Sequence, residues 1–109
     1  MLDIRYYVTA SGESPFAEWF AEQDVAASAK IVRALARIEE GNLSNIKSVG
    51  EGVLEFRIDF GPGYRIYFGR DGETIIVLLT GGTKKRQQRD IDAAHAYWQD
   101  YRRSKRGRV

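Results

Sequence analysis

The sequence predicts an α+β domain of element order β-α-α-β-β-β-α, in which a mostly antiparallel four-stranded sheet carries a helical hairpin and a C-terminal helix. Three observations support this class. Residues 53–79 contain three apolar runs separated by two turn signals. Residues 15–41 and 89–101 carry apolar side chains at helical spacing. The 109 residues, 43% of them hydrophobic and none of them cysteine, suit one core without disulfides.

The first elements are a strand and a short helix. Residues 2–8 (LDIRYYV) are rich in β-prone residues and alternate loosely, which predicts the first strand. Ser14 followed by Pro15 predicts a helix start, because serine caps free amides and proline is tolerated in the first turn. One stripe of this helix holds Phe16, Trp19, Phe20 and Gln23.

A second helix is expected to begin at its N-cap, Asp24, and to stop at Gly41. Its predicted apolar face consists of Val25, Ile31, Val32, Leu35 and Ile38. The two helices, almost without a linker, should form a hairpin on one side of the sheet. The polar residues 42–52 are expected to form a loop that moves on binding.

The three runs of residues 53–79 predict an antiparallel meander. In the first run an apolar set, from Leu54 to Phe60, alternates with a mostly charged one. Gly61-Pro62-Gly63 and Asp71-Gly72 are the turn signals. The third run, Ile75–Leu79, is apolar without alternation, as expected of a central strand that is covered on both faces. The polar face of the first two strands is expected to stay open to solvent, because it carries Glu55, Arg57, Arg65 and Tyr67.

Residues 80–85 (TGGTKK) predict a turn after the central strand, and the last helix should begin between Thr83 and Arg89. Its docking stripe is Ile91, Ala94, Trp98 and Tyr101. We expect one domain over residues 1–103 and a basic, disordered tail over residues 104–109, where no apolar stripe continues.

Charge is distributed unevenly along the chain. Residues 84–109 hold nine Lys and Arg against three Asp, whereas the other 83 residues hold eight basic and twelve acidic side chains. This asymmetry indicates a polyanion or an acidic protein as partner, or else a solvated basic tail. The absence of cysteine, of a membrane-length apolar run and of a secretory signal predicts a cytoplasmic protein without membrane association.

Several kinds of site are disfavoured by residue type. His95 is the only histidine and should serve in packing or on the surface, and no acidic cluster has metal-ligand spacing, so neither a metal nor a cofactor is expected. No cysteine or G-x-S-x-G motif offers a nucleophile. The glycine-rich segments match no P-loop or dinucleotide fingerprint.

The remaining candidate is a cationic surface with aromatic residues. Arg57 and Arg65, on neighbouring strands, could bind one phosphate through their planar guanidinium groups. Tyr67 offers a ring for base stacking. Further candidate RNA contacts follow the central strand: Lys84, Lys85, Arg86 and Arg89. The alternative is a cross-strand ladder in which Glu55 pairs with the two arginines and which has no catalytic role.

Such a site suits RNA cleavage by the substrate's own 2′-hydroxyl, because the protein then needs only to align the hydroxyl, stabilise charge and move protons. In this hypothesis Arg57 and Arg65 stabilise the transition state. Glu55 takes the hydroxyl proton, and Lys84 or Lys85 assists the leaving oxygen.

The run GVLEFRIDFGPGYRIYF, followed by DGETIIVLLTGGTKKRQQRDIDAA, resembles the RelE/ParE superfamily of toxins, and more closely its HigB-like branch of addiction module killer proteins. The resemblance extends from the first strand to Tyr101. It implies a toxin of a type II toxin–antitoxin module that cleaves mRNA on the ribosome without a metal ion and inhibits translation. By position, the arginine of the Tyr-Arg pair in such toxins matches Arg65, the basic position on the preceding strand matches Arg57, and Glu55 stands where some relatives have lysine.

The partner that the resemblance implies is a small antitoxin with a helix-turn-helix DNA-binding domain, besides mRNA and the ribosome. Two alternatives remain. One is a non-catalytic ParE-like toxin that binds DNA gyrase, and the other is an inactive module that only binds its antitoxin.

Overall fold

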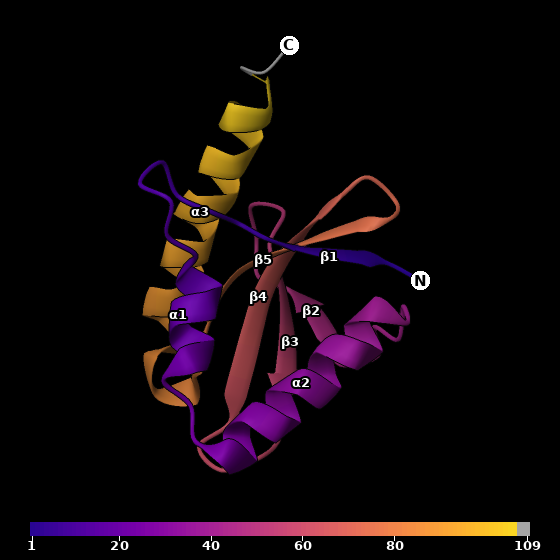
Figure 1. Ribbon diagram of the computed structural model, residues 1–109, viewed down its shortest axis with the longest axis vertical. Coiled ribbons are helices and arrows are strands. Elements are labelled where there is room, and N and C mark those ends of the chain that lie inside the picture. Colours follow the sequence, from indigo (N-terminus) through magenta and orange to yellow (C-terminus); the bar gives the residue numbers. More distant parts are fainter. Residues whose placement is uncertain (107–109) are drawn as a thin grey trace.

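The computed structural model describes residues 1–106, which form one five-stranded sheet and three α-helices (Figure 1). The strand order is β1-β5-β4-β3-β2, with β1 parallel to β5 and all other neighbours antiparallel. The strands are β1 (Asp3–Tyr6), β2 (Ile46–Ser48), β3 (Leu54–Ile58), β4 (Tyr64–Asp71) and β5 (Ile75–Thr83). The predicted α+β class is therefore confirmed, and so is the meander, which is β3, β4 and β5.

The helices begin where the capping signals predict. α1 (Pro15–Ala21) is capped by Ser14, whose side chain accepts from the Ala17 amide at 3.2 Å, and α2 (Val25–Glu39) by Asp24, which accepts from the Ala27 amide at 2.8 Å. Gly41 follows α2 with a φ of +82°, which suits glycine. A single 3₁₀ turn, η1 (Lys84–Arg86), leads into α3 (Gln87–Arg106).

The helices cover both faces of the sheet, so the polar face of β3 and β4, expected to stay open, is partly covered. α1 and α2 pack on one face, over a core that includes Phe16, Ile31, Ile66 and Leu78. α3 packs on the opposite face, against Tyr67, Val77 and Leu79, and lies behind α1 in the view of Figure 1. The unbroken apolar run of β5 required this second layer, because its odd and even side chains point to opposite faces.

The segment predicted as a loop, residues 42–52, contains a strand. β2 pairs with β3 and is the fifth strand of the sheet. The turn that joins them closes through a bond from the Val49 amide to the Val53 carbonyl at 3.0 Å. Gly50, Glu51 and Gly52 all have positive φ there. With only three residues, β2 is too short for its alternation to be visible in the sequence.

The buried stripe of α2 also differs from the expected one. Val25 and Val32 are 88% and 53% exposed, whereas Ala27 and Ala34 are buried beside Ile31 and Ile38. These four buried positions recur at intervals of four, three and four residues, so they form one continuous stripe.

α3 docks through the predicted stripe: Ile91, Ala94 and Trp98 are buried and Tyr101 is partly buried. The helix runs to Arg106, so residues 104–106 are helical rather than part of a disordered tail, and residues 107–109 lie outside the described residues. Within residues 1–106, no helix combines the length and the apolar character needed to cross a membrane.

Asp71, at the end of β4, ties the hairpin to the last turns of α3. It accepts from the Tyr101 hydroxyl at 2.7 Å and from Lys105 at 2.6 Å. The hydrogen bond from Lys105 has the largest effect on the pKa of Asp71, and the bond from Tyr101 has the next largest. Together they lower this pKa below its ordinary value of 3.8. These bonds therefore stabilise the fold at pH values above 3.8. The stabilisation is lost as the pH falls through the lower pKa that Asp71 has in the folded state.

We therefore expect Asp71→Asn to lower the free energy of unfolding by about 1 kcal/mol at pH 7, since one partner, Lys105, is exposed. Urea unfolding at several pH values checks this. The gap between variant and wild type should shrink below pH 4, and a gap that widens in acid would contradict the assignment.

Candidate functional site

The register of β3 and β4 brings four of the predicted site residues to one face, the face that α3 partly covers. Arg57 lies directly opposite Arg65, and Glu55 lies opposite Tyr67. Lys47 of β2 faces Glu55 from the other side. The sequence thus predicted correctly which side chains of β3 and β4 share a face. It missed Lys47, because residues 42–52 were read as a loop.

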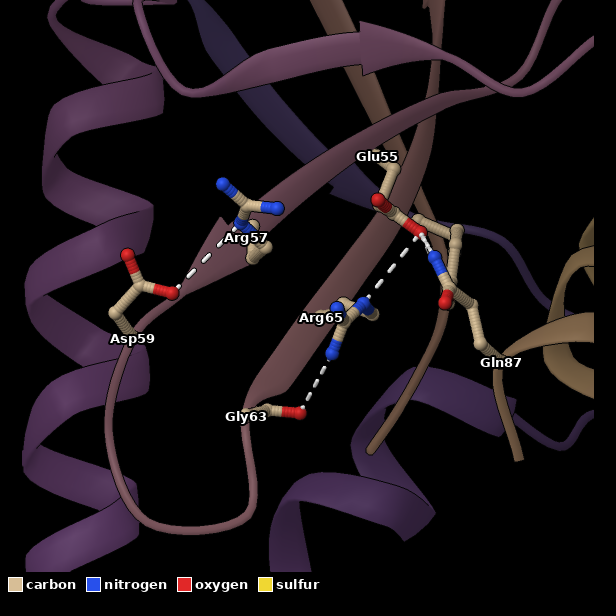
Figure 2. A network of polar contacts seen from close by, with 7 residues as sticks. Glu55, Arg57, Asp59, Gly63, Arg65 and Gln87 are labelled. Atoms are coloured by element: carbon tan, nitrogen blue, oxygen red, sulfur yellow. Dashed lines mark hydrogen bonds and ion pairs between the residues drawn. The ribbon is translucent and has the colours of Figure 1, made fainter. Parts of the chain in front are cut away.

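Three of the four predicted site residues on this face are buried. Glu55 and Arg65 are 3% and 5% exposed, and Tyr67 is fully buried. α3 begins above them, and its first residue, Gln87, donates to Glu55 Oε2 at 2.9 Å (Figure 2). The expectation of an open face is therefore wrong for these three residues.

Glu55 is the centre of a buried polar network. Its Oε2 accepts from the Tyr67 hydroxyl at 3.0 Å as well as from Gln87, and lies 3.8 Å from Arg65 Nε. Charges this deep are tolerated only when paired, so Glu55 and Arg65 depend on each other. Burial and the Glu55 charge raise the pKa of Tyr67 far above its ordinary range, which keeps the phenol neutral. The tyrosine ring is sealed in the core and is not placed to stack on a base.

Arg65 is held on one side and short of acceptors on the other. Its Nη1 donates to the Gly63 carbonyl at 3.0 Å (Figure 2). Its Nε makes no hydrogen bond within the described part of the chain, because 3.8 Å is too long for one. The guanidinium therefore retains a buried donor that an additional acceptor would satisfy.

Arg57, by contrast, is exposed. Its side chain retains 59% of its accessible surface, and its Nε lies 3.7 Å from Asp59 Oδ1. In Figure 2 both guanidinium groups lie on the near side of the sheet, with Arg57 toward α2 and Arg65 toward Gln87. Part of the predicted ladder is therefore present: Glu55 pairs with Arg65, while Arg57 pairs with Asp59.

A hollow of about 220 Å³ opens beside Arg57. The residues that line it are Ser44, Asn45, Ile46, Lys47, Glu55, Arg57 and Asp59. Two cations, Lys47 and Arg57, and two carboxylates, Glu55 and Asp59, line it. A group that contacts Arg57 from this hollow would lie next to Arg65, the cross-strand neighbour of Arg57.

The basic residues after β5 line the same end of the sheet. The Lys84 amide donates to the Gly63 carbonyl at 3.0 Å, and this carbonyl also accepts from Arg65. One carbonyl thus links the β3–β4 loop, Arg65 and the start of η1. The side chains of Lys84, Lys85, Arg86 and Arg89 are all exposed.

Two glycines that were read as part of a turn belong to β5, and they explain how close the helices come. A Cβ at Gly81 would lie 2.2 Å from the Trp19 ring, and one at Gly82 would lie 1.8 Å from Asp90 Oδ2. Consecutive glycines inside a strand indicate such close approach. The prediction of a turn over residues 80–85 did not use this signal. Burial raises the pKa of Asp90, while Arg89 and Arg86 act in the opposite direction.

His95 has a packing role, as expected, since its Nε2 lies 2.9 Å from the Val49 carbonyl oxygen. Within residues 1–106, no three His, Cys, Asp or Glu side chains are grouped so that they could hold a metal ion.

The sequence profile of the family described as Phage derived protein Gp49-like (DUF891) matches residues 18–97. The chain belongs to this Gp49-like family. It is also 40% identical, over 80 residues, to an uncharacterized protein of Haemophilus influenzae (strain Rd), a match that covers 72% of this chain and 81% of that protein.

The Gp49-like family comprises toxins of toxin–antitoxin modules that are related to the RelE-like toxins, so an antitoxin is the partner that membership implies. The resemblance to RelE-like toxins is thereby confirmed at the level of the family. The matched region contains every predicted site residue, from Glu55 to Arg89.

Proposed function

We propose that this Gp49-like protein is a HigB-like toxin that cleaves mRNA on the ribosome, without a metal ion, by attack of the 2′-hydroxyl on the neighbouring phosphate. The observation that carries the proposal is the direct cross-strand pairing of Arg57 with Arg65, next to exposed Lys84 and Lys85. Guanidinium groups fixed at such a point stabilise charge as it develops on phosphate oxygens.

The two arginines have different parts in this mechanism. Arg57 is accessible and would contact the phosphate first, giving up its long, exposed contact with Asp59. Arg65 lies behind it, with an Nε that lacks an acceptor, and a phosphate oxygen that reaches this Nε would supply one. Both cations then offset the charge of the five-coordinate phosphorus.

In the proposal Glu55 has a positioning part rather than proton abstraction, because it is buried. A general base must come within hydrogen-bond reach of the hydroxyl, and Glu55 is buried and already accepts two hydrogen bonds. In the proposal it holds Arg65 in place. Water takes the proton of the 2′-hydroxyl as its oxygen bonds to phosphorus. Lys84 or Lys85, both accessible, protonates the leaving 5′ oxygen, so that the products carry a 2′,3′-cyclic phosphate and a 5′-hydroxyl.

The test is Arg57→Ala, because this side chain is exposed and its loss leaves the core intact. We expect the cleavage rate to fall about 100-fold, the cost of one preorganised donor at a developing charge, while the free energy of unfolding changes by less than about 0.5 kcal/mol. Cleavage is measured by mapping mRNA 5′ ends after induced expression and with purified protein and ribosomes. The matched control, Arg70→Ala at the far end of β4, should cleave as the wild type does.

Two results would contradict the proposal. Full activity of Arg57→Ala would remove this arginine from the site. Intact mRNA together with a DNA-damage response in the wild type would indicate a gyrase-directed toxin instead. The same assays in EDTA test metal independence, and activity that is lost there and restored by a divalent ion would overturn that part.

A further inference from the structure

A second hollow, which is cationic, lies on the other side of Arg57, between α2 and the end of β3. Its volume is about 230 Å³. α2 contributes Lys30, Arg33 and Arg37 to its wall, β3 contributes Arg57, and the β3–β4 loop contributes Asp59 and Phe60. We call this hollow the α2 groove.

The α2 groove has an excess of positive charge that the described residues do not neutralise. Lys30, Arg33 and Arg37 follow one another at intervals of three and four, so they form a stripe along α2 beside its buried stripe. Within residues 1–106, neither Arg33 nor Arg37 has an ion pair, and Lys30 Nζ lies 5.2 Å from the centroid of the Phe60 ring. Asp59, already close to Arg57, is the only acidic residue in the wall.

Such a stripe is unfavourable for the helix alone, because like charges at these spacings repel one another. Arginine and lysine stripes of this kind are suited to phosphates, to which arginine can donate two parallel hydrogen bonds. The chemistry of the groove therefore points to a polyanion with regularly spaced charges.

The α2 groove is continuous with the hollow over the candidate site. Arg57, Asn45 and Asp59 line both, so they form the wall that the two hollows share. An RNA strand that contacts Arg57 with one phosphate from the β2 side would therefore have its neighbouring phosphates within reach of the α2 groove.

We propose that the α2 groove binds the sugar–phosphate backbone of the RNA strand whose scissile phosphate contacts Arg57. This inference rests on the proposed function and adds a second phosphate-binding surface to it. Since backbone contacts position a strand but carry no base information, the groove sets affinity and register and not sequence preference.

The test uses Lys30→Gln/Arg33→Gln/Arg37→Gln and a single-stranded RNA with 2′-O-methyl groups throughout, which binds but cannot be cleaved. Fluorescence anisotropy gives the dissociation constant as a function of salt. Log K falls as log salt rises, and each lost phosphate contact makes this slope shallower by about 0.7. We therefore expect the slope of the triple variant to be shallower by about 2. At low salt, affinity should fall at least 10-fold.

A matched triple, Arg70→Gln/Arg102→Gln/Arg103→Gln, removes the same charge from the opposite end of β4 and from α3. It should retain the wild-type slope, which separates a local site from the effect of net charge. The double variant Arg33→Gln/Arg37→Gln, which keeps the Lys30–Phe60 contact, guards against a folding defect. Its slope should fall by about 1.4.

The outcomes separate this inference from the proposed function. If the α2 triple binds RNA as the wild type does while Arg57→Ala fails to cleave, the groove is not an RNA site and the proposed function stands. Equal losses of RNA affinity in both triple variants would also overturn the inference that the α2 groove binds RNA. So would an α2 triple variant that keeps its RNA affinity but no longer binds an acidic protein partner. If wild-type protein neither binds nor cleaves RNA, the proposed function fails as well.

Discussion

Glu55→Ala is expected to lower the free energy of unfolding by about 3–5 kcal/mol, because it leaves the buried Arg65 charge without its counter-charge. Tyr67 and Gln87 also lose their acceptor. For a domain of this size the midpoint of thermal unfolding should drop by more than about 10 °C. Urea unfolding followed by fluorescence measures the free energy, and calorimetry measures the midpoint.

Three variants accompany this measurement. Glu55→Gln keeps an acceptor for Tyr67 and should cost less than the alanine variant. Asp59→Ala, which removes the exposed partner of Arg57, should change stability by less than about 0.5 kcal/mol. Glu55→Leu/Arg65→Met, which removes both charges, should recover most of the loss. A loss in Glu55→Ala no larger than that in Asp59→Ala would show that the pair is not buried as described.

Trp98→Ala should cost about 3–5 kcal/mol, the usual range for truncating a large buried aromatic side chain. Trp98 is 6% exposed and stacks on Tyr101 with ring centroids 5.3 Å apart. Its indole also fills the space above Gly69, where a Cβ would lie 2.6 Å from the ring. This one side chain therefore fixes α3 to the middle of β4.

The pair Trp98 and Gly69 gives a sharp test by a double-mutant cycle. Gly69→Ala alone should destabilise by about 1–3 kcal/mol, because the added methyl group meets the indole. In the Trp98→Ala background the same change should be neutral or stabilising, because the methyl group enters the space that the indole leaves. Additive effects would contradict the proposed contact.

Much of the sheet could be predicted because the signals are local. The alternation in residues 54–60 and the capping residues Ser14 and Asp24 act within a few positions of the chain, and the structure confirms each of them. β2 was not predicted, because three residues are too few to show an alternation of apolar and polar side chains. The prediction that Val25 and Val32 face the core was wrong, because alanines occupy part of the buried stripe of α2.

The candidate site was harder to predict, since burial depends on distant parts of the chain. Alternation correctly placed Glu55 and Arg65 on one face, but charged residues normally indicate solvent. Gln87, 32 positions after Glu55, begins the helix that covers them. The Gly81-Gly82 pair did signal a close neighbour, but nothing in the sequence identified Trp19 or Asp90 as that neighbour.

The pairing of β1 with β5 has a consequence for how this protein is made. Asp3 pairs with Ile75, so β1 can take its place in the sheet only after β5 has been synthesised. Bringing together two segments so far apart in the chain costs conformational entropy, which is offset only by the contacts of the complete sheet. We therefore expect nascent chains to remain incompletely folded until β5 has left the ribosome.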